Sequence, residues 1–569
     1  MATSLEFEQF IKEIGKTKTN ANITLIREAF YFAKSAHGEQ KRTSGEPYFL
    51  HPIETAKIVA SYDLDDETIA AALLHDVVDD TPITHKEIEK KFGPTVAFLV
   101  QGVTKLGKFK YRGIERQVEN LRKMFLAMAE DIRVVLIKLA DRLHNVNTLK
   151  ALPPDKRRRI ALETIEIYSP IADRLGMGEL KGLLEDASFP YAYPEKWAWL
   201  MANIKDKFET SRAYIEGIKP QVLKELRAQG IVPVEIQARA KHYMSLMRKL
   251  EKYDMNFEKV YDMVALRIIV DTVEQCYATL GIIHGLFKPL PGRIKDYVAL
   301  PKMNGYQSLH TTVICYEGKI TEIQIRTLEM HKHAEHGIAA HWSYSEKGKP
   351  KGGPILDEKK LAWVRQLQEW QNELREEGQD SKEFLESLKI DFFKERIFAF
   401  TPDGDVIDLP EGATPIDFAY MIHSEIGDHC AGAKANGKMV SLDYPLHNGD
   451  VVEIITQKNK KPTTAWFSLA KTNYARAKVR RYIEKSAPKI KHRYQFKVGV
   501  KHKVGIISNI TGVMAKAKIS ITEITSDTSH PKVGYIFIRF SSDDEKLLED
   551  VAKKIKRNPD IISVETKML

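Results

Sequence analysis

The sequence predicts a multidomain α+β protein in which an all-α region comes first and sheet-containing modules follow. A chain of 569 residues is too long for one hydrophobic core. Apolar residues recur at three- and four-residue spacing up to about residue 190, whereas later segments alternate apolar with polar residues. The segment from Tyr494 onward has the order strand, helix, strand, strand, helix, strand. Together these patterns favour several modules of different type.

The first two modules are expected at residues 20–195 and 196–345. The first is all-α, because segments such as AKIVA, ETIAAALLHDVV and VVLIKLADRL have helical spacing of apolar residues. The second begins with a long helix and continues with strand patterns at 264–270, 310–316 and 320–326, which is typical of an α/β domain. Residues 346–393 are expected to be a Gly/Pro/Lys linker followed by charged helices.

Three smaller modules follow. Residues 394–457 are expected to form a β-grasp-like unit, because short strand patterns are separated by the turn signals PDGD, ANGK and HNGD. Residues 458–490 are expected to be a basic helical segment. Residues 491–569 have the βαββαβ order of a ferredoxin-like domain.

The composition is that of an ordinary globular protein, with 43% hydrophobic and 29% charged residues. No apolar run reaches the roughly 18–20 residues that a membrane span needs. The start MATSLEFEQF lacks the layout of a signal peptide. The three cysteines, Cys276, Cys315 and Cys430, lie far apart and exclude a disulfide scaffold. We expect a cytoplasmic protein without membrane contact.

Positive charge is concentrated near the C-terminal end of the chain. The segment Thr456–Lys503 holds fifteen Lys or Arg residues against a single acid, Glu484, in a chain whose formal net charge is +10. A solvated face normally mixes both signs, so this stretch favours a polyanion such as RNA. It also contains Trp466, Tyr474, Arg476, Arg480, Arg481 and Tyr482.

Chemistry-bearing residues of the helical region gather in GEPYFLHP (45–52), LLHDVVDDT (73–81) and IKLADRLHN (137–145). His75 and Asp76 end an apolar helical run, and Asp79 and Asp80 follow about one turn later. With His51 and Asp141 they offer two imidazoles and several carboxylates, which suit a divalent ion such as Mn²⁺. Each histidine alone is better explained as a satisfied core residue, but burying an unpaired His-Asp pair is costly.

These segments resemble the HD metal-dependent phosphohydrolases, and with KRTSGEPY (41–48) they resemble the hydrolase domain of the RelA/SpoT homologues. The resemblance implies four Mn²⁺ ligands: His51, His75, Asp76 and Asp141. It also implies that Asp79 and Asp80 orient or activate the attacking water, that Arg42 packs on the guanine and that Asn145 contacts the nucleotide.

The chain departs from this family at two positions of the hydrolase motif. Asp79 stands where Glu is usual, and Thr43 where Lys is usual. Because Asp is one methylene shorter, a water held by Asp79 is displaced by about 1 Å, which can cost around 10²-fold in rate. The His-Asp pair is intact, so hydrolysis is expected, with a reduced rate left open.

The second module carries residues suited to nucleotides and magnesium. Asp262 and Glu322, each at a strand edge, offer the hard oxygen ligands that Mg²⁺ prefers. The stretch PKMNGYQSLHT (301–311) places many polar side chains around a glycine turn. Phosphates need cations, and the module supplies Arg239, Lys241, Lys249, Arg293, Lys295 and Lys302.

This module closely resembles the RelA/SpoT synthetase domain, which has a nucleotidyltransferase-like fold. The resemblance implies that Arg239 and Arg267 sandwich the adenine of ATP, while Lys241, Ser245 and Lys249 hold its phosphates. Asp262 and Glu322 are implied Mg²⁺ ligands, and Glu322 the base that deprotonates the guanosine 3′-hydroxyl. Arg293 and Lys295 match the basic loop variant of bifunctional members. Residues implied at the GDP or GTP site are Lys302, Asn304, Tyr306, Gln307 and His310.

The later modules resemble TGS and ACT domains, with a helical segment between them that is found in long family members. The resemblance implies that His423 meets the 3′ end of uncharged tRNA, that the ribosome is a partner, and that a homodimer is compatible with the family.

The favoured function is therefore a bifunctional alarmone enzyme that makes (p)ppGpp from ATP and GDP or GTP and hydrolyses it again. One alternative is a synthetase whose HD domain is inactive because of Asp79 and Thr43. The other is a non-catalytic regulator that binds tRNA or the ribosome. Decay should remove clustered acids and bases first, and here they are nearly complete.

Overall fold

A computed structural model describes residues 2–15, 22–107, 123–340, 396–486 and 492–569, apart from positions 125, 129, 303, 502, 529–532 and 543–544. The expected linker and helices at 346–393 fall outside the described residues. The chain forms two compact units. One comprises Met1–Ile397 with Asp408–Glu411, and the other comprises Phe398–Ile407 with Gly412–Leu569.

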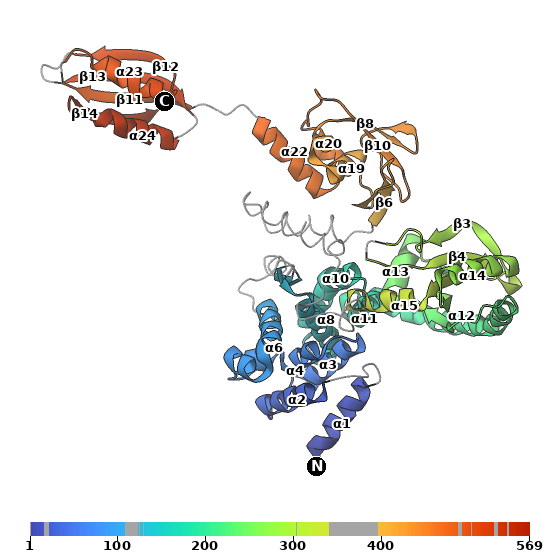
Figure 1. The fold of residues 1–569 in the computed structure, drawn as a ribbon. Coiled ribbons are helices and arrows are strands. Elements are labelled where there is room, and N and C mark those ends of the chain that lie inside the picture. Colours follow the sequence, from blue (N-terminus) through green and yellow to red (C-terminus); the bar gives the residue numbers. More distant parts are fainter. Residues whose placement is uncertain are drawn as a thin grey trace. The chain divides into compact units, whose positions relative to one another are not determined.

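The first unit begins with helices, which confirms the all-α prediction for this region (Figure 1). They are α1 (Ala2–Ile14), α2 (Ile23–His37), α3 (Leu50–Ser61), α4 (Asp66–Leu74), α5 (Val77–Asp80), α6 (His85–Gly107), α8 (Ile132–Asn147), α9 (Pro154–Glu163), α10 (Ser169–Arg174), α11 (Gly178–Ala192) and α12 (Pro194–Ala228). A 3₁₀ turn η1 (Leu149–Ala151) and a π-helical turn η2 (Thr164–Tyr168) join them.

Helix α4 is central to this region because it is apolar on all sides. Every residue from Thr68 to Leu74 is buried, as expected of a helix inside a domain core. Its start is fixed by Asp65, whose side chain accepts a hydrogen bond from the backbone N–H of Thr68 at 2.8 Å. With its start fixed in this way, the helix runs to Leu74 and places His75 at its C-terminal end.

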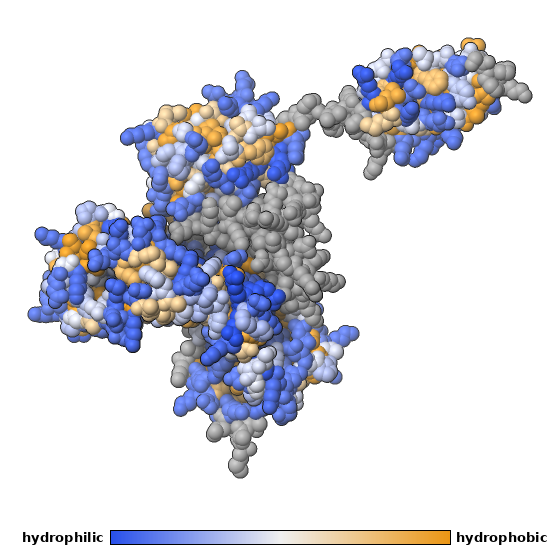
Figure 2. All heavy atoms as spheres, turned by 180° about the vertical axis from the view of Figure 1, so that it is seen from behind, coloured by the Kyte–Doolittle hydropathy of each residue, from blue (hydrophilic) through white to orange (hydrophobic). Residues whose placement is uncertain are grey.

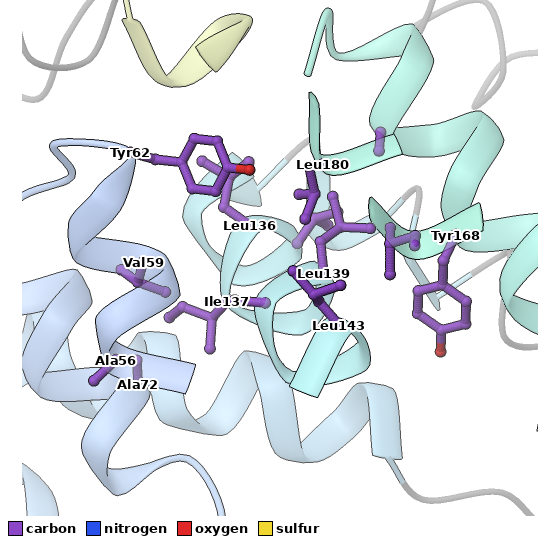
Figure 3. Packing of buried hydrophobic residues seen from close by; sticks show 14 of the residues in the cluster. Ala56, Val59, Tyr62, Ala72, Leu136, Ile137, Leu139, Leu143, Tyr168 and Leu180 are labelled. Atoms are coloured by element: carbon purple, nitrogen blue, oxygen red, sulfur yellow. The ribbon is translucent and has the colours of Figure 1, made fainter. Parts of the chain in front are cut away.

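Helix α8 packs between the earlier and later helices of this core. Figure 3 shows Ile137 beside Val59 of α3 on one side of α8, with Leu139 and Leu143 facing Leu180 on the other. All five are less than 10% exposed. Because buried apolar side chains are held by close packing, α8 presents its polar residues in a fixed direction.

The next part of the first unit contains a mixed five-stranded sheet of order β1-β2-β5-β4-β3. The strands are β1 (Glu235–Ala240), β2 (Val264–Val270), β3 (Lys288–Asp296), β4 (Leu309–Ile314) and β5 (Ile320–Thr327). Strands β2, β4 and β5 confirm the sequence prediction. Strands β1 and β3 were missed, because β1 has few apolar residues and β3 contains Pro289, Pro291 and Gly292.

The two faces of this sheet have different roles. On β5 the apolar residues Ile323 and Ile325 are buried in a core with residues of α12 and α14 (Val273–Leu286). Since neighbouring residues of a strand point to opposite faces, Glu322, Gln324 and Arg326 share the other face. That polar face carries the candidate site of this region.

Two small modules follow, and most of their residues belong to the second unit. The first has β6 (Arg396–Phe400), β7 (Val406–Pro410), α19 (Pro415–Ile422), α20 (Ser424–Asp428), β8 (Cys430–Ala435), β9 (Lys438–Val440) and β10 (Val452–Thr456), followed by α21 (Trp466–Leu469) and α22 (Asn473–Ser486). Strands β10, β8 and β9 pair in that order. The basic helix α22 shares a core with α19, to which Trp466 belongs. Trp466 is only 4% exposed, so our grouping of it with the RNA-facing aromatic residues is wrong.

The last module confirms the predicted βαββαβ order. Its sheet has the order β12-β13-β11-β14 with all pairs antiparallel. Its elements are β11 (His492–Val500), α23 (Ile506–Lys516), β12 (Ile521–Asp527), β13 (Gly534–Ser542), α24 (Glu545–Lys556) and β14 (Ile561–Met568).

Among the described residues, every helix is too short or too polar to cross a bilayer. Figure 2 shows hydrophilic residues over much of the visible face, with apolar areas between them.

Candidate active sites

The first candidate site forms where α4 ends and α5 begins. His75 caps the C-terminus of α4, and Asp76 precedes the short helix α5. The Nδ1 atom of His75 lies 2.8 Å from the carbonyl oxygen of Ala72, which fixes the ring and leaves Nε2 as the free nitrogen. His75 is 1% exposed. Helix α4 thus places the Nε2 atom of His75 inside the buried site.

Three of the four predicted metal ligands meet there. Atoms of His51, His75 and Asp141 lie within 4.8 Å of one another. His51 Nε2 is 3.1 Å from Asp141 Oδ1. The carboxylate of Asp76 adjoins both histidines, at 3.2 Å from His75 Nε2 and 3.5 Å from His51 Nε2. Helices α3, α4 and α8 each contribute to this centre.

The donor set fits a divalent metal ion. The Nε2 atom of His75 is buried beside the Asp76 carboxylate, at 3.2 Å, but makes no well-formed hydrogen bond to the described residues. Buried polar atoms are rarely left in that state, and a metal ion would use this nitrogen. Two imidazoles with carboxylates form an open N/O site rather than a closed thiolate site.

Charges in the centre are strongly coupled. Burial would lower the pKa of His75, but Asp76 and Asp141 outweigh it and raise that pKa to about 9. Burial opposes ionisation of Asp76, yet His75 and His51 hold its pKa below the usual range. The half-buried Lys138 lies 2.6 Å from Asp141 Oδ2 and helps to lower the pKa of Asp141, whose own burial would raise it. Both carboxylates are therefore ionised, as metal ligands must be.

The predicted nucleotide contacts of this site lie beside the ligands. Asn145 donates from Nδ2 to Asp141 Oδ1, and its own Oδ1 accepts from Arg42 Nη2 at 2.6 Å. Arg42 also reaches Thr148 Oγ1 at 3.3 Å. The loop from residue 41 to 47 is closed by a bridge between Lys41 and Pro47. Arg42, expected at the guanine, and Asn145, expected at the nucleotide, thus lie next to the metal ligands.

Two further residues of this centre were missed from the sequence. Tyr48 donates its hydroxyl to Asp76 Oδ2 at 2.9 Å and to Asp80 Oδ2 at 2.6 Å. His144 has its Nδ1 at 2.7 Å from His51 Nδ1, and burial lowers its pKa to about 4. Both lie inside the motifs GEPYFLHP and IKLADRLHN, so their positions were available as a signal.

The two carboxylates expected to act on water differ in their attachment. Asp79 and Asp80 are both exposed on α5. Tyr48 links Asp80 to the metal ligand Asp76, and Gln40 Nε2 donates to the backbone oxygen of Asp80 at 2.8 Å. Asp79 lies on the same turn at the solvent side, in keeping with a side chain that can hold a water.

The second candidate site lies on the polar face of the five-stranded sheet. Asp262 precedes β2, and Glu322 is the third residue of the central strand β5. Lys241 Nζ lies 2.5 Å from Asp262 Oδ2, and Lys249 Nζ lies 2.6 Å from Oδ1. Burial opposes ionisation of Asp262, but these two lysines hold its pKa below normal. Lys241 and Lys249 thus both contact the Asp262 carboxylate.

Glu322 lies close enough to Asp262 to raise that residue's pKa. His310 Nδ1 is 3.2 Å from Glu322 Oε1. Burial would raise the pKa of Glu322, but His310 and Gln324 outweigh it and lower that pKa to about 2. Two ionised carboxylates a short distance apart are hard oxygen donors that fit Mg²⁺.

The residues that are expected to bind the guanine nucleotide form a cluster beside Glu322. Tyr306 has its hydroxyl 2.8 Å from His310 Nε2, and its ring is in edge contact with Tyr297. Lys302 Nζ lies 5.3 Å from the centre of the Tyr306 ring. Gly305, with φ +77°, makes the turn between them. Asn304 Nδ2 donates to the Asp173 carbonyl at 3.2 Å, and Gln307 Nε2 to that of Val298 at 3.3 Å.

The residues expected at ATP lie on the other side of Glu322. Arg239 and Arg267 share one face of the paired strands β1 and β2, in the register Gln237↔Arg267 and Arg239↔Ala265. Ser245 and Lys249 lie on α13 (Tyr243–Lys252), which follows β1. Burial, with Arg326 and Arg239 nearby, lowers the pKa of Arg267 to about 9.

Lys295 stands opposite His310 in the pairing of β3 with β4 and so adjoins the residues expected at the guanine nucleotide. Arg293 and Lys295 are exposed on β3, and no ion pair in the described part of the chain involves either. His423 is exposed between α19 and α20, where its Nδ1 accepts a hydrogen bond from the backbone N–H of Glu425 at 3.3 Å.

Four family models match the chain. They are the HD domain at residues 29–178, the region found in RelA / SpoT proteins at 238–349, the TGS domain at 397–456 and the ACT domain at 494–560. This layout of modules confirms the predicted order.

Curated relatives match most of the chain. A guanosine-3′,5′-bis(diphosphate) 3′-pyrophosphohydrolase of Aquifex aeolicus is 48% identical over 486 residues, which cover 84% of this chain and 68% of that protein. The bifunctional (p)ppGpp synthase/hydrolase SpoT of Escherichia coli is 45% identical, covering 84% and 67%. A GTP pyrophosphokinase of Myxococcus xanthus is 45% identical, covering 83% and 62%. The chain thus spans about two thirds of the length of these relatives. With such identities over most of its residues, it belongs to the RelA/SpoT family of (p)ppGpp synthases and hydrolases.

Proposed function

We propose that this chain both makes and hydrolyses (p)ppGpp, using two separate sites. The observation that carries the proposal is that two ionised carboxylate clusters lie on different elements of the first unit. One lies among α3, α4 and α8 with two histidines, and the other on the polar face of the sheet with lysines. The first set suits water-driven cleavage at a metal, and the second suits binding of two nucleotides.

In the hydrolase site, His51, His75, Asp76 and Asp141 hold the ion, for which Mn²⁺ is the proposed identity. A divalent ion held by these residues would supply Lewis-acid polarisation of a phosphoryl oxygen and would make water a stronger nucleophile at neutral pH. Asp80, held by Tyr48, and Asp79 orient the attacking water. Arg42 and Asn145 bind the nucleotide. Water adds to the phosphorus of the 3′-pyrophosphate, and GDP or GTP leaves with pyrophosphate as the second product.

In the synthetase site, Arg239 and Arg267 enclose adenine, while Lys241, Ser245 and Lys249 bind the phosphates of ATP. Tyr306 stacks on the guanine, and Lys302, Asn304, Gln307 and His310 line that subsite, with Arg293 and Lys295 at its rim. Asp262 and Glu322 hold Mg²⁺, whose charge offsets that of the phosphates when it is bound. The guanosine 3′ oxygen attacks the β-phosphorus of ATP and AMP leaves, while Glu322 takes the hydroxyl proton.

The direct test uses the purified chain and both pairs of substrates. With ATP, GDP and Mg²⁺ we expect (p)ppGpp and AMP in equal amounts. With ppGpp and Mn²⁺ we expect GDP and pyrophosphate, and chelation of the metal should stop this reaction. Synthesis without hydrolysis would favour the alternative in which Asp79 and Thr43 have inactivated the HD domain. Absence of both reactions would favour a regulator without catalysis.

The second unit is proposed to contact tRNA and the ribosome. Helix α22 buries Ala475 and Val479 in a core with α19. Its basic residues Arg476, Lys478, Arg480 and Arg481 are half-buried, and His423 is exposed for the tRNA 3′ end. Neutralising several phosphates makes affinity fall by about 10³-fold or more between 50 and 200 mM salt. We expect such a fall for uncharged tRNA in a fluorescence anisotropy titration. Affinity that does not change with salt would contradict this role.

A further inference from the structure

Each of the two arginines assigned to adenine has its edge bound to one carboxylate. Arg239 Nη2 lies 3.2 Å from Glu179 Oε2, and Arg267 Nη1 lies 3.1 Å from Glu335 Oε1. Neither acid was singled out from the sequence, and both are distant in the chain from the arginine that they contact. Glu179 lies on α11, and Glu335 on α15 (Leu328–His336).

Glu179 is itself held firmly. His242 Nε2 lies 3.4 Å from its Oε2, and His242 Nδ1 lies 2.8 Å from Asp186 Oδ2 on the same helix. The hydrogen bond from His242 is the main reason why the pKa of Glu179 falls to about 2. Hydrogen bonds to Asp186 and Glu179 outweigh burial and raise the pKa of His242 to about 9. The acid and its histidine partner are therefore both charged at neutral pH.

Close packing fixes the distance between α11 and the strand that carries Arg239. The ring of His242 lies over Gly182, where an added Cβ would come within 2.2 Å of it. The backbone N–H of Met244 donates to Asp186 Oδ1 at 3.0 Å. Helix α11 thus joins the start of α13 at several points, and Glu179 cannot move away from Arg239 independently.

Glu335 has a corresponding place on the other side. Its Oε1 also lies 3.1 Å from Nη2 of Arg326, which neighbours Arg267 across β2 and β5. Arg267 is 2% exposed and Arg326 is 1% exposed. A single carboxylate therefore serves two buried guanidinium groups.

We propose that Glu179 and Glu335 are positioning residues of the ATP site, each fixing the plane of one guanidinium so that its flat face meets the adenine. This inference rests on the proposed function, in which Arg239 and Arg267 enclose that base. A guanidinium bonded at its edge keeps both faces available for stacking. An arginine that is already ordered loses less side-chain entropy when the ligand binds.

The test is steady-state synthesis by the full chain carrying Glu179→Gln, with kcat and the two KM values measured separately. We expect KM for ATP to rise about tenfold, the loss typical of one hydrogen bond between charged groups. KM for GDP and kcat should change by less than about twofold. An unchanged KM for ATP overturns the role of Glu179, and so does an equal rise in KM for GDP.

The matched control is Glu251→Gln on α13. The Glu251 side chain is 40% exposed where that of Glu179 is 37% exposed, and like Glu179 it takes part in an ion pair, with Lys196 at 2.5 Å. In the described part of the chain, no ion pair joins Glu251 to a residue assigned to a nucleotide. We expect this variant to keep all three constants, and a rise in KM for ATP matching that of Glu179→Gln would overturn the inference.

A double variant separates positioning from general support of the fold. If Glu179 acts through Arg239, adding Glu179→Gln to Arg239→Ala produces no further rise in KM for ATP, whereas an independent effect adds fully and overturns the inference. Arg239→Ala alone tests the proposed function. A normal KM for ATP in Arg239→Ala would rule out stacking of Arg239 on the adenine. If KM for ATP is raised in Arg239→Ala but normal in Glu179→Gln, only the positioning role of Glu179 is ruled out.

The variant Glu335→Gln tests the positioning role of Glu335. It retains the shape of the side chain but removes the charge shared by Arg267 and Arg326. In the folded variant, identified by its thermal unfolding transition, KM for ATP should rise about tenfold or more and KM for GDP should not. A folded variant with an unchanged KM for ATP overturns the role of Glu335.

Discussion

Asp262→Ala is expected to abolish synthesis of (p)ppGpp and to leave hydrolysis intact. Asp262 is the acid that both Lys241 and Lys249 contact, within 2.6 Å, and it is a proposed Mg²⁺ ligand. Its removal leaves two lysines without their shared anion, and weakens the binding of the metal ion that offsets phosphate charge. Single charged groups that stabilise phosphoryl transfer are worth about 10³–10⁵ in kcat.

This result would be measured as AMP release from ATP in the presence of GDP, beside GDP release from ppGpp. Asp271→Ala is the matched control, because Asp271 directly follows the other end of β2 and is exposed. It should leave both rates unchanged. If Asp262→Ala removed hydrolysis as well, in a protein with normal thermal unfolding, the assignment of two separate sites would be wrong.

The sequence was sufficient where chemistry-bearing residues lie in short segments. His75 and Asp76 are adjacent, and Asp141 and Asn145 are one helical turn apart, so their joint presence in one pocket follows from local geometry. The strands β2, β4 and β5 are short segments rich in β-branched residues, and this local signal was enough to find them. In these cases few residues separate the groups that must meet.

Groups that meet only through the tertiary fold were missed. Glu179 and Glu335 look like ordinary solvated acids on helices, and nothing local indicates that each reaches an arginine on a distant strand. Trp466 was placed with the RNA-facing residues because its neighbours are basic, but it is buried because α22 packs on α19. Strand β3 was missed because two prolines and a glycine usually end a strand.

The charge state of the synthetase carboxylates was also beyond the sequence. Glu322 is the proposed acceptor of the guanosine hydroxyl proton, and its contacts with His310 and Gln324 lower its pKa to about 2 despite burial. It is therefore ionised at neutral pH, the state that both a metal ligand and a proton acceptor require.

Asp76→Ala is expected to give the opposite separation of activities, with hydrolysis lost and synthesis retained. The Asp76 carboxylate lies 3.2 Å from His75 and 3.5 Å from His51, so it completes the metal-binding group. It also accepts the hydroxyl of Tyr48, which positions Asp80. One substitution therefore weakens both metal binding and the orientation of the attacking water, and we expect a loss of more than about 10³-fold in hydrolysis.

The fold should tolerate Asp76→Ala, because the substitution does not leave His75 as a buried, unpaired cation. Asp76 is the main group that holds the pKa of His75 at about 9, and without it the buried histidine can lose its proton instead of remaining a stranded cation. Binding of Mn²⁺ should be measured by calorimetry as well as activity, with Asp155→Ala on the exposed side of α9 as the control. Full Mn²⁺ affinity in Asp76→Ala would show that the ion is held elsewhere. Loss of synthesis in this variant would mean that the two activities share a site, because the changed carboxylate belongs only to the helical centre.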